Sequence, residues 1–144
     1  MRIVLDTNIL VRSAAKADGL ARRLLHTISN GPHRLIISPF ILDEVARVLA
    51  YRRIRTPWGL TDEDIQEHVN LLAAAAEIVE PLTIERVVLA DPDDDAIVHT
   101  ALSGRADVLC TRDVHLSHPG VLQFCALHGI QVMDDIDLYR TLHP

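Results

Sequence analysis

Short apolar runs alternate along this chain with longer segments in which apolar residues recur every three or four positions. Continuous β-branched and leucine residues predict buried strands at 2–6, 35–38, 108–110 and 130–133, and a further short strand at 78–79. Helical spacing predicts helices after the first strand and at 19–28, 40–52, 61–76, 97–104, 121–128 and 136–142. This alternation predicts an α/β fold in which helices cover both faces of a mainly parallel sheet of four to five strands.

Capping and turn residues mark where several of these predicted helices begin and end. Thr7 or Asn8 is expected to cap the first helix, and the segment 57–59, Pro-Trp-Gly, is expected to break the helical pattern. Two later helix starts are predicted by a capping side chain followed by proline, at Ser38-Pro39 and Asp91-Pro92.

Composition narrows the class of protein. The 144 residues contain no repeat or linker, so one domain spanning 1–144 is expected, with a core of leucine, isoleucine, valine and alanine because aromatic residues are few. The sequence shows no signal peptide and no apolar run long enough to cross a bilayer, which predicts a cytoplasmic protein that contacts no membrane. In that reducing location Cys110 and Cys125 are expected to be free, buried thiols.

The net charge of −6 argues against a generally basic, nucleic-acid-binding surface. Much of this acidity is local, because removing the four aspartates in 91–95 would change the charge to −6 + 4 = −2. A local basic rim remains compatible with this charge. Its candidates are the arginines and lysine at 12–23 and the arginines at 52–55, although an ordinary solvated surface explains each run as well.

Two carboxylates follow predicted strands. Asp6 ends the first strand, and Asp113 comes shortly after the strand at 108–110. The carboxyl ends of parallel strands are where open α/β sheets form their sites. Taken singly, an aspartate at the end of a strand is more often a turn or cap residue.

Glu44 lies on the predicted apolar face of its helix, three residues after Ile41 and four before Val48. Its neighbour Asp43 is expected to point outward, with Arg47 as a surface partner. A carboxylate facing the sheet indicates either a functional site or a buried ion pair with an arginine.

The aspartate-rich segment 91–95 offers several candidates. Asp94 shares the inward face of the helix that contains Ile97, whereas Asp91 is expected to cap that helix and Asp95 lies at the edge of the inward face. The competing explanation is that acidic residues in a first helical turn are favoured by the helix dipole and need no function.

Together, Asp6, Glu44, Asp94 and Asp113 are expected to project toward one end of the sheet. Four such carboxylates repel one another unless a cation holds them, and an all-oxygen ligand set points to Mg²⁺ or Mn²⁺. A carboxylate-held divalent ion suits phosphodiester hydrolysis, because it lowers the pKa of a bound water and stabilises the developing charge.

Two other kinds of site, a zinc site and a phosphatase site, fit the sequence less well. His115 and His118 have a spacing that suits Zn²⁺, but no cysteine or third histidine lies close in sequence. An Asp-x-Asp phosphatase is disfavoured because the residue two after Asp6 is Asn8, which cannot serve as the protonating acid.

The motifs resemble, in order and spacing, those of the PIN-domain nucleases, most closely the prokaryotic branch of toxins from toxin–antitoxin pairs (VapC-like ribonucleases). The resemblance covers essentially the whole chain and rests on Val4-Leu5-Asp6-Thr7-Asn8, Ser38-Pro39, Glu44-Val45, 91–97 and Thr111-Arg112-Asp113. It implies an α/β/α sandwich that cleaves single-stranded RNA with Mg²⁺ or Mn²⁺. Asp6, Glu44, Asp94 and Asp113 fall on the family's metal-binding acids, with Asn8, Thr111, Asp91 and Asp95 in support.

The resemblance also implies a homodimer that a small antitoxin protein neutralises. One departure is His115, which stands where relatives often carry a further carboxylate. The alternatives to a toxin are a PIN nuclease of RNA processing or DNA maintenance, and an RNA- or protein-binding PIN-like module with weak or no cleavage.

Overall fold

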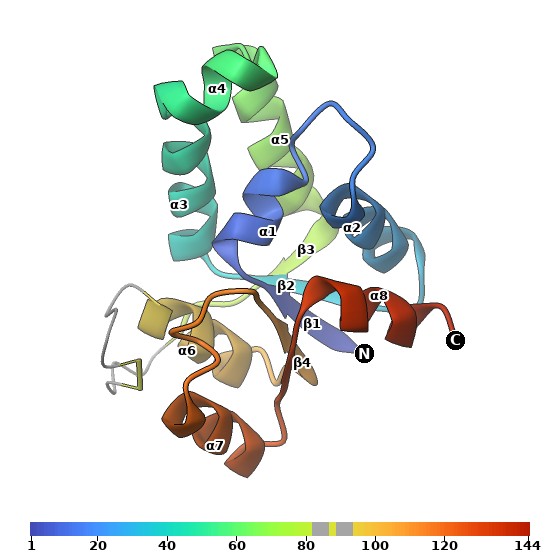
Figure 1. Ribbon diagram of the computed structural model, residues 1–144, viewed down its shortest axis with the longest axis vertical. Helices are drawn as coiled ribbons and strands as arrows, with labels where there is room; N and C mark the ends of the chain where they lie inside the picture. Colours follow the sequence, from blue (N-terminus) through green and yellow to red (C-terminus); the bar gives the residue numbers. More distant parts are fainter. Residues whose placement is uncertain (82–86, 89–93) are drawn as a thin grey trace.

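The computed structural model describes residues 1–81, 87–88 and 94–144 and contains a five-stranded, wholly parallel sheet (Figure 1). The strand order is β3-β2-β1-β4-β5, so the first strand occupies the centre. The predicted α/β class and strand number are therefore confirmed. The strands are β1 (Arg2–Leu5), β2 (Arg34–Ile37), β3 (Ala76–Ile78), β4 (Val108–Cys110) and β5 (Gln131–Met133).

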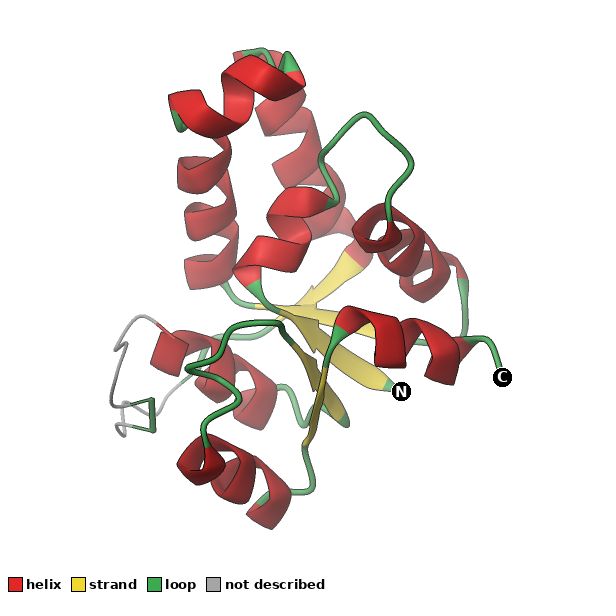
Figure 2. Cartoon of the chain, in the orientation of Figure 1, coloured by secondary structure: helices red, strands yellow, loops and turns green. Residues whose placement is uncertain are grey.

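Helices cover both faces of the sheet, which gives the three-layer α/β/α arrangement (Figure 2). In Figure 1, α6 and α7 lie below the sheet, α1, α2 and α8 lie above it, and α3, α4 and α5 extend upward. The bounds are α1 (Thr7–Arg12), α2 (Leu20–Asn30), α3 (Pro39–Leu49), α4 (Arg52–Trp58), α5 (Asp62–Ala75), α6 (Asp95–Ser103), α7 (Pro119–Leu127) and α8 (Asp135–Leu142).

The position of β1 in the core explains why its sequence is a continuous apolar run. Ile3, Val4 and Leu5 are completely buried, because this central strand has helices above and below it. On the lower face, α6 packs so closely on β2 that a Cβ at Gly104 would lie 2.4 Å from Cγ2 of Ile36. A glycine is therefore required where α6 ends against the sheet.

Three local expectations need correction. The helix predicted at 40–52 ends at Leu49, and a separate short helix, α4, follows it. Pro57 does not break the helical pattern but lies in the last turn of α4. The helix ends at Trp58, and Gly59 caps it with a φ of 62°, which only glycine adopts readily. The cap of α1 is Asp6 itself, not Thr7 or Asn8.

Cys110 and Cys125 are both buried and free, as predicted. Burial raises the pKa of the Cys125 thiol to about 11 and that of Cys110 further still, so both remain protonated near neutral pH. Among the helices of the described residues, none has the length and apolar character needed to cross a membrane.

Candidate metal centre

The register of the central strands brings two predicted site residues together. Leu5 pairs with Cys110 across β1 and β4, and the Asp6 backbone N–H donates to the Cys110 carbonyl at 3.0 Å. Asp6 and Thr111 are thus the first residues beyond two neighbouring parallel strands. Their side chains meet, and the Thr111 hydroxyl donates a hydrogen bond to Oδ2 of Asp6.

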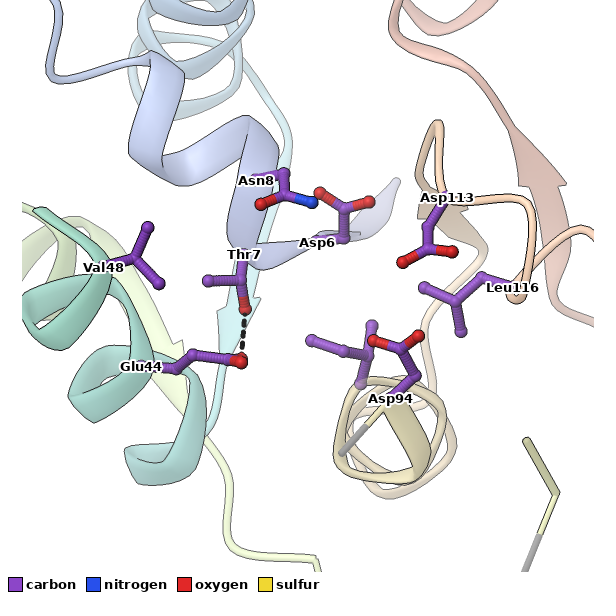
Figure 3. A pocket seen from close by; sticks show the side chains of 9 residues that line it. Asp6, Thr7, Asn8, Glu44, Val48, Asp94, Asp113 and Leu116 are labelled. Carbon is purple, nitrogen blue, oxygen red and sulfur yellow. Dashed lines mark hydrogen bonds between the residues drawn. The ribbon is translucent and has the colours of Figure 1, made fainter. Parts of the chain in front are cut away.

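A cavity of about 140 Å³ opens at this edge of the sheet (Figure 3). Asp6, Asp94 and Asp113 point into the same space from β1, the start of α6 and the loop after β4, and Glu44 reaches it from α3. The lining therefore contains all four predicted acids. Its other members are Thr7, Asn8, Val48, Ile97 and Leu116.

Asp6 both caps α1 and carries a buried carboxylate into the cavity. The residue is 4% exposed, and its Oδ1 accepts the Ile9 backbone N–H at 3.0 Å to cap α1. Burial raises the pKa of Asp6, and the hydrogen bonds from Thr111 and Ile9 oppose this rise. A bound cation would favour the ionised form of this carboxylate.

Asp113 is held by its own loop. Its backbone N–H donates to the Thr111 hydroxyl at 2.9 Å, and its Oδ1 accepts the His115 backbone N–H at 2.8 Å. Thr111 therefore bonds both strand-end aspartates.

One compact group has the composition of a metal site. Asp94, Asp113 and His115 each offer a ligand atom, and these atoms lie within 4.8 Å of one another. Two carboxylates and an imidazole fit a divalent cation, with Asp6 on the same cavity. His118 is not part of this group because its side chain caps α7 by accepting the Gly120 N–H at 3.1 Å. The structure therefore does not support zinc held by the His115–His118 pair.

Glu44 lies at the opposite side of the cavity, turned toward Thr7 (Figure 3). The Thr7 hydroxyl donates to Glu44 at 2.7 Å, and Arg47 forms a 3.5 Å ion pair with it. The expected partnership of Arg47 with Asp43 is thus wrong, because the i,i+3 position of Arg47 brings it to Glu44 instead. The ion pair is not a buried one, since the Arg47 side chain is 60% exposed.

The supporting residues separate into different environments. Asp95 accepts the backbone N–H groups of Val87 and Val88 at 2.8 and 2.6 Å, which anchors that short segment to α6. Asn8 is exposed at the cavity. Asp91 and Pro92, the predicted helix start, lie outside the described residues, and α6 is described from Asp95 with Asp94 at its N-cap.

The sequence interpretation missed a charged cluster beside the acids. Asp135, the first residue of α8, has a fully buried side chain, and it pairs with Arg112 at 2.5 Å and Arg12 at 3.4 Å. The available signal was its position two residues beyond β5, at the same sheet edge as Asp6 and Thr111.

Comparison with known proteins agrees with this architecture. Among solved structures, the crystal structure of VapBC2 from Rickettsia felis bound to a DNA fragment from their promoter contains a chain of similar fold. The TM-score is 0.59 at 15% sequence identity, and the match covers 93% of this chain and 98% of that chain. No curated protein matched the sequence. The sequence profile described as PIN domain matches residues 2–115. With this match over most of its length, the chain belongs to the PIN-domain family.

Proposed function

We propose that this protein is a metal-dependent endoribonuclease that hydrolyses phosphodiester bonds of single-stranded RNA. The observation that carries the proposal is the convergence of Asp6, Glu44, Asp94 and Asp113 on one cavity at the carboxyl edge of a PIN-domain sheet. Carboxylates that converge on one space repel one another, and a bound cation would relieve that repulsion.

The residues that line the cavity have different proposed roles in metal binding and orientation. Asp94 and Asp113 would hold Mg²⁺ or Mn²⁺ with Asp6, and Glu44 would complete the acidic lining from α3. When bound, the ion supplies an activated water and stabilises charge on the scissile phosphate. Thr111 orients Asp6, Thr7 orients Glu44, and Asn8 offers an exposed amide at the cavity. Asp95 would support the site from the first turn of α6, and a supporting role for Asp91, which lies outside the described residues, stays a prediction from the sequence.

The cellular role we propose is that of a toxin in a toxin–antitoxin pair. The fold similarity to a chain of VapBC2 supports this assignment. The protein would act in the cytoplasm as a homodimer formed by one domain per chain, and a small antitoxin protein would inhibit it. Co-expression with the product of an adjacent short reading frame should suppress RNA cleavage, and cleavage that no neighbouring product inhibits would favour a PIN nuclease of RNA processing.

The direct test uses purified protein and an end-labelled single-stranded RNA. Cleavage is expected with Mg²⁺ or Mn²⁺ and is expected to stop when EDTA is added. Asp113→Asn and Asp94→Asn should each reduce the cleavage rate by about 100-fold or more, because a catalytic metal contributes several kcal/mol of transition-state stabilisation.

The matched control is Asp43→Asn, which removes an exposed carboxylate from α3 next to Glu44 and should leave the rate unchanged. RNA binding without cleavage in either metal would instead identify a weakly catalytic binding module. Full activity of Asp113→Asn would overturn the metal mechanism.

A further inference from the structure

Two arginines lie beside the acidic cavity on a second cavity of about 220 Å³. This second cavity is lined by Asp6, Asn8, Arg12, Arg112 and Asp113, so it shares three residues with the acidic one. The guanidinium groups and the proposed metal ligands therefore face adjoining space.

A buried carboxylate anchors both arginines. Oδ1 of Asp135 accepts Nε of Arg112 at 2.5 Å, and Oδ2 accepts Nη2 of Arg12 at 3.4 Å. The Asp135 side chain is 0% exposed, whereas those of Arg12 and Arg112 are 39% and 49% exposed. The carboxylate thus lies inside the protein while its two partners reach solvent at the cavity.

The arginine pair retains hydrogen-bond donors that Asp135 does not use. Among the described residues, Asp135 is the one carboxylate within ion-pair distance of either arginine, and Arg112 uses only Nε in its contact with Asp135. Within the part of the chain that the structure describes, no other acceptor bonds to the Arg112 guanidinium. Its Nη groups therefore remain able to donate, and a guanidinium fork matches the oxygens of a phosphate.

A purely structural ion network would explain the anchoring of α8. It would not explain why two half-exposed guanidinium groups line the same cavity as Asp6 and Asp113. An RNA strand positioned for hydrolysis at the acids places a neighbouring backbone phosphate within this adjoining space, where positive charge is needed.

We infer that Arg12 and Arg112 form a binding subsite for a backbone phosphate of single-stranded RNA, next to the phosphate that is cleaved. Asp135 acts as a positioning residue that holds the two guanidinium groups at the cavity. This inference rests on the proposed function and specifies how the substrate is held. It assigns a role to three residues that the four-acid motif does not include.

The test measures binding of a fluorescein-labelled single-stranded RNA in EDTA, where no cleavage occurs, over a series of salt concentrations. The double variant R12Q/R112Q should bind on the order of tenfold more weakly near 0.1 M salt. The slope of log K against log salt should fall by about 0.7, since each neutralised single-strand phosphate contributes about 0.7 and the two arginines share one phosphate.

The matched control is R23Q/R140Q. It also removes two positive charges, and each of these arginines pairs with an exposed aspartate away from both cavities. Its salt slope should equal that of the wild type. Arg12→Gln alone, which leaves the shorter Arg112–Asp135 bond intact, should lower the slope by part of this amount even if the double variant folds poorly.

Asp135→Asn separates positioning from charge. It makes the protein less negative, so net charge alone predicts tighter RNA binding, whereas loss of positioning predicts binding weakened by at least about threefold. Unchanged or tighter binding by Asp135→Asn would overturn the positioning role. Slopes for R12Q/R112Q and Arg12→Gln equal to the wild-type slope would overturn the subsite while leaving metal-dependent cleavage intact. Absence of RNA binding and cleavage by the wild type would overturn both proposals.

Discussion

The Thr111 hydroxyl donates a hydrogen bond to the buried carboxylate of Asp6, and the two residues stand directly beyond neighbouring parallel strands. The same hydroxyl accepts the backbone N–H of Asp113 at 2.9 Å. One short side chain therefore sets the relative position of two proposed metal ligands. Because both bonds depend only on the ends of β1 and β4, the sheet itself organises this half of the site.

Thr111→Val should impair catalysis more than folding. Valine keeps the shape of threonine but loses both hydrogen bonds, so no shared hydroxyl fixes the positions of Asp6 and Asp113 relative to each other. We expect a destabilisation of about 1–3 kcal/mol in urea unfolding and about a tenfold lower RNA cleavage rate. Thr111→Ser restores the hydroxyl and should recover most of the rate, so equal activity of the valine and serine variants would contradict this role.

Asp6→Asn should make the metal-free protein more stable near pH 7.5. Burial raises the pKa of Asp6 in the folded protein above its value in the unfolded chain. The folded state is therefore favoured while Asp6 is protonated, and this stability is lost as the pH rises from the unfolded-state pKa through the raised folded-state pKa. Asparagine removes the buried charge and can still accept the Ile9 N–H with its amide oxygen. In EDTA the melting temperature should rise by about 2–5 °C.

For comparison, the exposed Asp43→Asn should leave the melting temperature unchanged. Added Mg²⁺ should stabilise the wild type more than Asp6→Asn, because binding to the folded state alone shifts the unfolding equilibrium. A marked fall in the melting temperature of Asp6→Asn in EDTA would show that this carboxylate matters more to folding than to metal binding.

The fold was predictable where local patterns are strong. The apolar runs of β1, β2 and β4 and the helical spacing of α2, α5 and α7 follow directly from burial between helix layers. The break between α3 and α4 was missed because the apolar spacing continues across it, and no glycine or proline marks the segment Ala50–Tyr51.

The site was predictable only in part. Strand ends and helical phase were enough to place the four acids on one cavity, because these are properties of single elements. The Arg12–Asp135–Arg112 cluster joins Arg12 to a residue 123 positions away, so only the packing of α8 against the sheet edge reveals it. The bond from Thr7 to Glu44 similarly depends on how α1 and α3 face each other.

His115 should shift metal preference away from Mg²⁺. Its ring lies with Asp94 and Asp113 in the compact ligand group, and imidazole suits Ni²⁺ better than Mg²⁺, which prefers oxygen ligands. His115→Asp should therefore lower the ratio of Ni²⁺ to Mg²⁺ affinity by about tenfold in calorimetric titrations. His118→Asn, which can retain the cap of α7, is the matched control and should leave this ratio unchanged. An unaltered ratio in His115→Asp would place the imidazole outside the ligand set.

His68 should make the protein less stable under mildly acidic conditions. Its Nε2 lies 3.1 Å from both the Leu10 carbonyl and the Ser13 hydroxyl, and burial, with a smaller effect of the Arg22 charge, lowers its pKa. The unfolded chain therefore binds this proton first as the pH falls below about 6.5, and stability present above that pH is lost toward the lower folded-state pKa. Urea unfolding between pH 7.5 and 5.5 should show this loss, at no more than about 1.4 kcal/mol per pH unit from one group.

His68→Gln should flatten the pH dependence of the unfolding free energy, whereas His26→Gln, at an exposed position, should not. Identical pH profiles for His68→Gln and the wild type would show that the half-buried imidazole does not control stability in this range.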